Sequence, residues 1–140
     1  MITFKAFYEA TKQPLGLVET LDIKGIGKVP GKVDSGNGAY NVIHGVNIKV
    51  VDNMVTFDTV NSKQVTLPLV DIIKINIGSG VIEDRPVIKL DVKIGDKIFK
   101  NTRFSIGNRS DNEYKILIGK DFIEKLGGLI DITKNNIYDK

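Results

Sequence analysis

Lys32-Val33-Asp34-Ser35-Gly36 is the stretch that decides how the fold of this 140-residue chain is interpreted. A strand pattern ends at Val33, and an acid, a hydroxyl residue and a glycine follow it. The glycine lets the backbone approach the Asp34 carboxylate closely, and a carboxylate delivered at a strand end can act as a general acid or base. The alternative interpretation is a turn in which Asp34 caps its own backbone.

A carboxylate of this kind gains a specific chemistry when a second one faces it. Two such groups share one proton, because like charges that close cannot both ionise. The ionised acid then activates a water molecule while the protonated acid polarises a carbonyl, and aspartic proteases are the established example. The pattern Asp-Ser/Thr-Gly occurs once in this sequence. A two-carboxylate site therefore requires two chains, with Asp34 opposite its own copy across a twofold axis.

Strand patterns dominate the rest of the chain. One short helix is predicted at Lys120–Leu126, where Phe122, Ile123 and Leu126 share a face and Gly127-Gly128 can end the helix. Short strands at this spacing predict an all-β barrel or sandwich, formed as a single domain over residues 1–140. Alternating or β-branched runs predict strands at residues 2–7, 17–23, 46–51, 54–60, 64–67, 71–77, 86–94, 98–106 and 129–132.

Composition removes several classes of function. The chain has no Cys and one His, His44, which excludes a disulfide framework and argues against a zinc site. Its 20 basic and 17 acidic residues are interspersed, so we expect no nucleic-acid partner. No apolar run approaches the ~18 residues that span a bilayer, and the N-terminus lacks a signal-peptide pattern. We therefore expect no membrane partner, and a location in the cytoplasm or within a phage particle.

Two further motifs fail on inspection. The glycines of residues 25–32 do not form a phosphate loop, because the Gly-Lys pairs lack the following Ser or Thr. A Ser/His/Asp triad built on His44 has no nucleophile elbow to support it. We therefore expect no cofactor and no metal.

Several segments, in their order and spacing, carry a family resemblance over roughly residues 16–133. These segments are Gly16–Glu19, Gly31–Gly36, Asn41–His44, Asp84–Ile88, Asn108–Ser110, Ile116–Ile123 and Leu129–Asp131. Together they resemble the retropepsin-like aspartic proteases, and most closely the bacterial and phage group labelled "ATP-dependent zinc protease". The chemistry of this chain offers no support for zinc or for ATP.

The resemblance implies a small closed barrel with one short C-terminal helix. It implies that Asp34 is catalytic and that Ser35 and Gly36 support its loop, although Thr is commoner than Ser at the second position. The strand ending at Gly119 is expected to pass behind this loop. His44 is either a further supporting residue or a hydrogen-bonded structural one, because the segment before it is about one residue longer than in the family.

Two hypotheses about function follow. The first is a homodimeric aspartic endopeptidase that cleaves a peptide or protein substrate with a shared Asp34 dyad, and the hairpin at residues 54–67 is either its flap or another sheet hairpin. The second is a catalytically silent protein of the same fold, such as a phage virion or head component with phage structural proteins as partners, since fold does not fix function. Arg109 is expected at the surface or in a salt bridge.

Overall fold

The computed structural model describes residues 15–34, 36, 40–125, 130–131 and 133–138. The predicted strand at residues 2–7, Ser35 and the glycines expected to end the helix lie outside these residues. The elements are β1 (Leu15–Gly16), β2 (Val18–Ile23), β3 (Gly27–Val33), β4 (Asn41–His44), β5 (Val46–Val51), β6 (Met54–Asp58), the 3₁₀ turn η1 (Val60–Ser62), β7 (Gln64–Pro68), β8 (Asp71–Asn76), β9 (Ile82–Ile94), β10 (Lys97–Gly107), β11 (Ile116–Ile118), α2 (Lys120–Lys125) and β12 (Ile130–Asp131).

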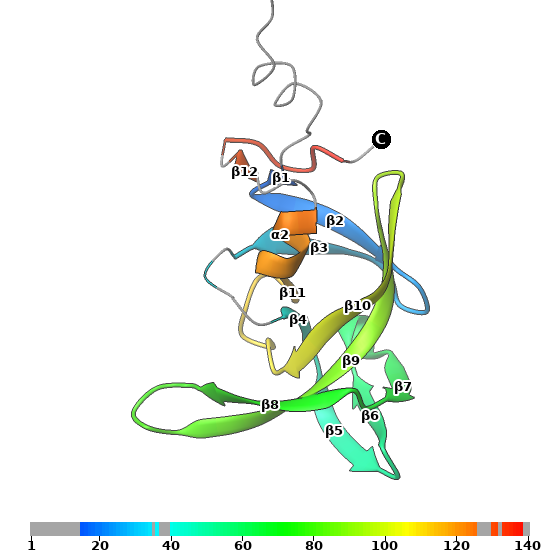
Figure 1. Cartoon of the computed structure of the whole chain (residues 1–140), viewed down its shortest axis with the longest axis vertical. Coiled ribbons are helices and arrows are strands. Elements are labelled where there is room, and N and C mark those ends of the chain that lie inside the picture. The colour runs from blue at the N-terminus through cyan, green and yellow to red at the C-terminus, as the bar shows by residue number, and fades with distance from the viewer. Residues whose placement is uncertain (1–14, 35, 37–39, 126–129, 132, 139–140) are drawn as a thin grey trace, which may run out of the picture.

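Six strands pair into a ring that closes on itself (Figure 1). The order is β10, β4, β11, β3, β2 and β9, and β9 pairs again with β10. The described residues are thus mostly β with one short helix, and the predicted all-β class is confirmed. The ring places β3, which leads into Asp34, between β2 and β11.

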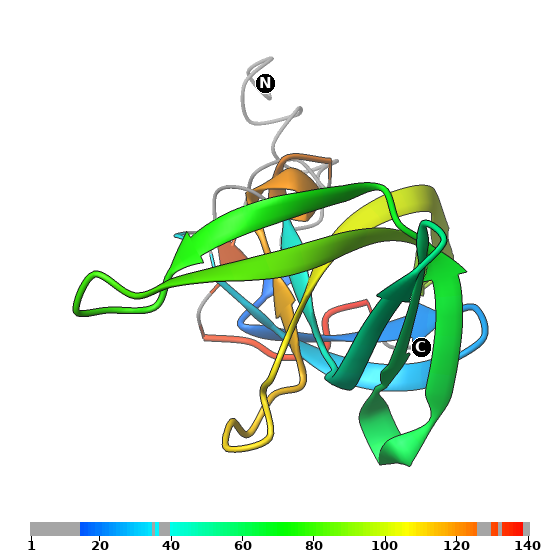
Figure 2. The same cartoon turned by 90° about the horizontal axis from the view of Figure 1, so that it is seen from below.

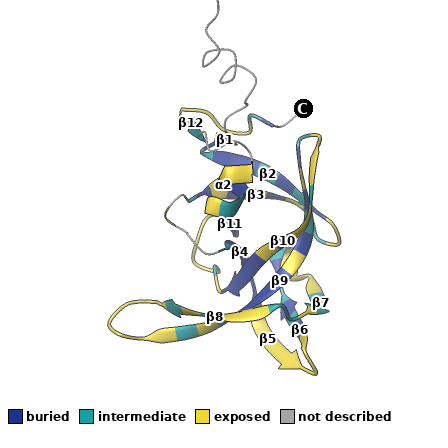
Figure 3. Ribbon diagram, in the orientation of Figure 1, coloured by how far each residue is buried: buried dark blue, intermediate teal, exposed yellow. Residues whose placement is uncertain are grey.

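The core lies inside this ring because its strands alternate apolar and polar residues. In β9, Ile88, Leu90 and Val92 are buried while Lys89 and Lys93 are exposed. Each fully buried aliphatic side chain contributes about 1.5–3 kcal/mol to folding. A slip of one residue would turn this apolar set toward water, so the alternation also fixes the register. Figure 3 shows the buried residues gathered on the ring strands.

A long hairpin leaves the ring where β9 extends beyond it. The first half of β9 pairs with β8, and this hairpin projects from the body of the molecule in two perpendicular views (Figures 1 and 2). Its turn contains Gly78 and Gly80, both at positive φ, and its end exposes Ile77, Val81 and Ile82. The strand predicted at 86–94 therefore begins four residues earlier, at Ile82.

A separate three-stranded sheet consists of β5, β6 and β7. The predicted hairpin at residues 54–67 is confirmed here, with η1 as its turn. Val55 and Phe57 of β6 are fully buried against the ring. Gly45 permits this close approach, because a Cβ there would lie 2.3 Å from Ile106 Cγ2 and 2.9 Å from Phe57 Cδ2.

The C-terminal segment folds back along the first strands. β12 pairs in parallel with β1, and the Asn136 N–H donates to the Val18 carbonyl at 2.6 Å. The fully buried Glu19 carboxylate accepts three backbone hydrogen bonds, from Gly16 at 2.7 Å, Ile137 at 3.2 Å and Tyr138 at 3.1 Å. Tyr138 is 2% exposed, so this carboxylate holds a segment that closes one side of the core.

Candidate active site

Asp34 directly follows β3 and is fixed by its neighbour β11. The Asp34 N–H donates to the Ile118 carbonyl at 2.9 Å, which continues the parallel pairing of the two strands. The Gly36 N–H donates to Asp34 Oδ1 at 3.1 Å. The carboxylate thus caps its own turn, as one interpretation of the tripeptide predicted. Its residue is only half-buried, so the turn also presents the acid to solvent.

A cavity of about 500 Å³ opens beside this carboxylate. Besides Asp34 and Gly36, it is lined by Ile73 and Ile75 of β8 and by Arg109. The strand end, the projecting hairpin and the loop between β10 and β11 therefore meet at one place. Asp34 is the one acid among the described residues that line this cavity.

The hairpin beside the cavity is β8–β9, and of the two interpretations of the hairpin at residues 54–67, a flap or another sheet hairpin, the structure agrees with the second. That segment belongs to the separate sheet, and none of its residues lines the cavity around Asp34. Both hairpins carry similar strand patterns in the sequence. Only the long second half of β9, which is built into the ring, brings Ile73 and Ile75 over the site.

Two arginines also line the cavity, and the sequence prediction missed their place in it. Burial and the neighbouring Arg85 lower the pKa of Arg109, and the Asp34 carboxylate raises it. The guanidinium stays charged, since the pKa of arginine is far above neutral pH. Arg85 lies against Gly107, where a Cβ would be 3.2 Å from its Cζ, and its Nε donates to Glu83 at 2.8 Å. The sequence did contain one indication that Arg85 and Arg109 belong to the site, because each lies in a segment that carries the family resemblance.

His44 ends β4 and is 9% exposed. Its Nδ1 accepts the Arg109 N–H at 2.9 Å, and its own N–H donates to the Lys115 carbonyl at 2.8 Å. Burial, followed by the charges of Lys115 and Arg109, lowers the pKa of this imidazole below its ordinary value of 6.5. The side chain is therefore neutral at pH 7, and it reaches the site through Arg109.

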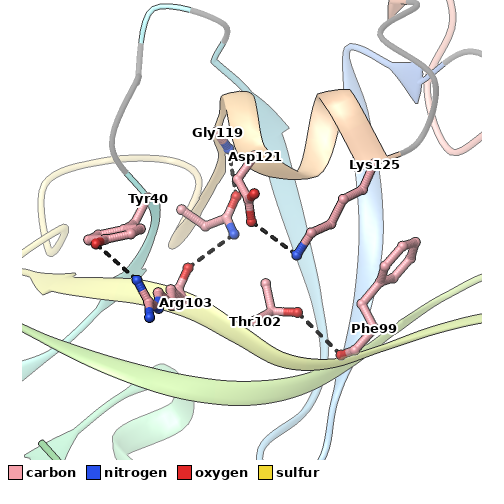
Figure 4. A network of polar contacts seen from close by, with 8 residues as sticks. Tyr40, Phe99, Thr102, Arg103, Gly119, Asp121 and Lys125 are labelled. Atoms are coloured by element: carbon pink, nitrogen blue, oxygen red, sulfur yellow. Dashed lines mark hydrogen bonds and ion pairs between the residues drawn. The ribbon is translucent and has the colours of Figure 1, made fainter. Parts of the chain in front are cut away.

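Gly119 directly follows β11 and is held by a residue that the prediction did not single out. Its N–H donates to Asn41 Oδ1 at 2.8 Å, and Asn41 Nδ2 donates to the Arg103 carbonyl at 3.2 Å. Asn41 is fully buried, and its hydrogen bond with Gly119 forms away from water, whereas the one to Arg103 is partly buried. Figure 4 shows this region, with the Arg103 guanidinium against Tyr40. These contacts fix the start of β4, just beyond the Asp34 loop.

Within the described part of the chain, no group of three or more His, Cys, Asp or Glu side chains is placed to hold a metal ion. Over the same residues, no helix has the length and apolar character needed to cross a membrane.

Comparison with known proteins identifies the family. The model of the RimB-like family, described as retropepsin-like aspartic endopeptidase RimB, matches residues 45–140. The chain belongs to the RimB-like family. The match includes the β8–β9 hairpin, Arg85, Arg109 and Gly119, and it begins one residue after His44. A particular closeness to the "ATP-dependent zinc protease" group stays a prediction.

A solved structure resembles this RimB-like chain over most of its length. It is protein Lpg0085 from Legionella pneumophila subsp. pneumophila str. Philadelphia 1, described as a protein of unknown function. The two chains are 26% identical with a TM-score of 0.73, and the match covers 89% of this chain and 97% of the other. No curated protein matches this chain. The comparisons thus establish a retropepsin-like fold, in keeping with the resemblance noted in the sequence.

Proposed function

We propose that this RimB-like protein is an aspartic endopeptidase that acts as a homodimer. The observation that carries the proposal is the place of Asp34, which ends β3 in a turn anchored by β11 and lines a cavity walled by the β8–β9 hairpin. Since Asp34 is the one acid among the described lining residues, the second carboxylate has to come from another copy. A twofold axis through the site supplies it.

The shared dyad accounts for peptide cleavage without a cofactor. Two Asp34 carboxylates in contact hold one proton between them. The ionised acid removes a proton from a water molecule, whose oxygen bonds to the scissile carbonyl carbon, while the protonated acid hydrogen-bonds to the carbonyl oxygen. The C–N bond then breaks, and the leaving amine takes up a proton from the dyad.

The charge of the cavity points to the kind of side chain that is accepted. Of the two guanidiniums that line the cavity, that of Arg85 is ion-paired with Glu83. An acidic substrate side chain would pair with the guanidinium of Arg109, which makes no ion pair among the described residues. A guanidinium binds a carboxylate through charge-assisted, often bidentate hydrogen bonds. We therefore propose that peptides with Glu or Asp next to the cleaved bond are preferred over peptides with Gln or Asn.

Arg109→Gln tests this preference. We expect the ratio of kcat/KM between a Glu peptide and its Gln counterpart to fall about 10-fold or more, since a hydrogen bond to a charged group contributes roughly 1.5–3 kcal/mol. Steady-state cleavage of the paired peptides measures the ratio. Lys63→Gln removes a positive charge from the exposed turn after η1 and serves as the control. An unchanged ratio in Arg109→Gln would refute the assignment.

The dimer is tested by light scattering over a concentration series. The chain has a mass of 15.5 kDa, so a dimer gives a molar mass of about 31 kDa, twice that value. A mass of one chain at every concentration would leave each Asp34 alone. That result would contradict the proposal and favour a catalytically silent, structural role, for example as a component of a phage particle.

A further inference from the structure

The loop between β10 and β11 is anchored at both ends by one residue. The imidazole Nδ1 of His44 accepts the Arg109 N–H at 2.9 Å, and the backbone N–H of His44 donates to the Lys115 carbonyl at 2.8 Å. The next residue adds a third bond, from the Gly45 N–H to the Gly107 carbonyl at 3.0 Å. The loop at residues 109–115 is thus closed on the end of β4.

Bonds inside the loop set the direction of its arginine. Lys115 Nζ donates to the carbonyls of Arg109 at 2.9 Å, Ser110 at 3.0 Å and Asn112 at 2.8 Å. Arg109 Nε donates to the Tyr114 carbonyl at 2.7 Å. The guanidinium is therefore tied to the loop backbone, and it moves with the loop. Its charge interacts with that of Asp34 in the present arrangement.

Of these anchors, the imidazole is the one that a proton can remove. Nδ1 accepts a hydrogen bond only in the neutral ring that carries its proton on Nε2, because both nitrogens of the imidazolium are donors. The charged groups that face His44 are Lys115 and Arg109, both cationic, and they act with burial against protonation. Around the same residue, the Thr59 hydroxyl donates to the His44 carbonyl at 2.7 Å.

We propose that His44 is a positioning residue whose neutral imidazole holds the 109–115 loop, and with it the Arg109 guanidinium, beside Asp34. His44 does not touch the reacting atoms and acts through Arg109. The effect on substrate rests on the proposed peptidase function, whereas the hydrogen bond and its dependence on protons do not. The two parts can therefore be tested separately.

The first test is an NMR titration of the unmodified protein, in which His44 is the only histidine. Long-range ¹H–¹⁵N spectra are expected to show the Nε2–H tautomer at pH 7 and a titration midpoint below 6.5. The amide resonance of Arg109 is expected to follow the same midpoint. An Nδ1–H tautomer, or an Arg109 amide resonance that does not shift as His44 titrates, would overturn the proposal whether or not the protein cleaves peptides.

The second test compares two substitutions that differ in hydrogen bonding. In His44→Asn the side-chain oxygen can still accept the Arg109 N–H, whereas in His44→Leu nothing can. We expect His44→Leu to raise KM for a Glu peptide about 3- to 10-fold with little change in kcat, and to leave the Gln peptide unaffected. His44→Asn is expected to keep the wild-type KM at pH 7. In the wild type KM for the Glu peptide is expected to rise at acid pH, as His44 is protonated, and in His44→Asn this rise is expected to be absent. Equal losses for both peptides in His44→Leu would indicate a merely structural role.

Stability provides a readout that does not require activity. Folding lowers the pKa of His44, so this group contributes stability at pH values above its pKa in the unfolded chain, about 6.5. This contribution is lost as the pH falls from that value toward the pKa in the folded protein. Urea unfolding at pH 7.0 and 5.5 is expected to show a larger loss for the wild type than for His44→Asn. The same loss of stability in both proteins would contradict the proposal. This test does not need His44→Leu and therefore holds even if that variant fails to fold.

Discussion

Asp34→Asn is expected to lower kcat/KM for peptide cleavage by about 10³-fold or more while leaving the fold intact. The amide is similar in size to the carboxylate, and its oxygen can still accept the Gly36 N–H that closes the turn. It can neither take a proton from water nor share one with a second copy. Positioned general acid–base groups typically contribute 10²–10⁴-fold to a rate. Peptide cleavage under single-turnover conditions measures the effect.

A matched control separates the loss of chemistry from the loss of a surface charge. Asp52 lies in the exposed turn between β5 and β6 at a φ of 51°, where asparagine is well tolerated. Asp52→Asn is therefore expected to cleave as the wild type does. Retained cleavage in Asp34→Asn would remove the peptidase proposal altogether.

Mixed dimers test whether the dyad is shared between chains. Wild-type protein refolded with an excess of Asp34→Asn distributes its subunits between like and unlike dimers. If each site needs two Asp34 carboxylates, activity falls with the square of the wild-type fraction, since unlike dimers are inactive. A fall in simple proportion to that fraction would mean that a single carboxylate suffices, and the shared-proton mechanism would be wrong.

Glu19→Leu is expected to destabilise the protein by about 3 kcal/mol or more. The substitution removes the acceptor of three N–H donors, those of Gly16 and Tyr138 in buried hydrogen bonds and that of Ile137 in a partly buried one. Each buried polar group that loses its partner costs roughly 1–3 kcal/mol. Glu19→Gln is expected to lose less, because one oxygen is kept. Urea unfolding measures the difference, with a lower midpoint and an unchanged slope expected.

Two controls sharpen this prediction. Asp22→Asn alters an acid on the same strand that is not buried, and its effect is expected to stay within about 0.5 kcal/mol, as for surface positions. Removing residues 136–140 takes away two of the three donors. The loss of stability in the variant that carries both the truncation and Glu19→Leu is therefore expected to be smaller than the sum of the losses in the two single variants. A small effect of Glu19→Leu, or full additivity, would refute the assigned role of the carboxylate.

The strands were predictable because a half-buried strand repeats every two residues. This pattern located the ring strands β2 and β10 to within one residue at each end. β5 was located at its observed bounds by its β-branched residues, although none of its residues is buried. The same logic failed at the start of β9. There the chain leaves the ring, and Ile82 and Asp84 are exposed while Glu83 and Arg85 are only half-buried, so no buried face imposes an alternation on the sequence.

Sequence by itself determined the all-β class, the short helix and the turn that presents Asp34, because each depends on contacts within a few residues. Tertiary structure alone decided which hairpin covers the cavity and that Arg85 and Arg109 line it. It also decided that Glu19 and Asn41 are fully buried. The physical reason is that a polar residue looks the same in sequence whether its partner is water or a distant backbone group. Only the closed ring brings those partners together.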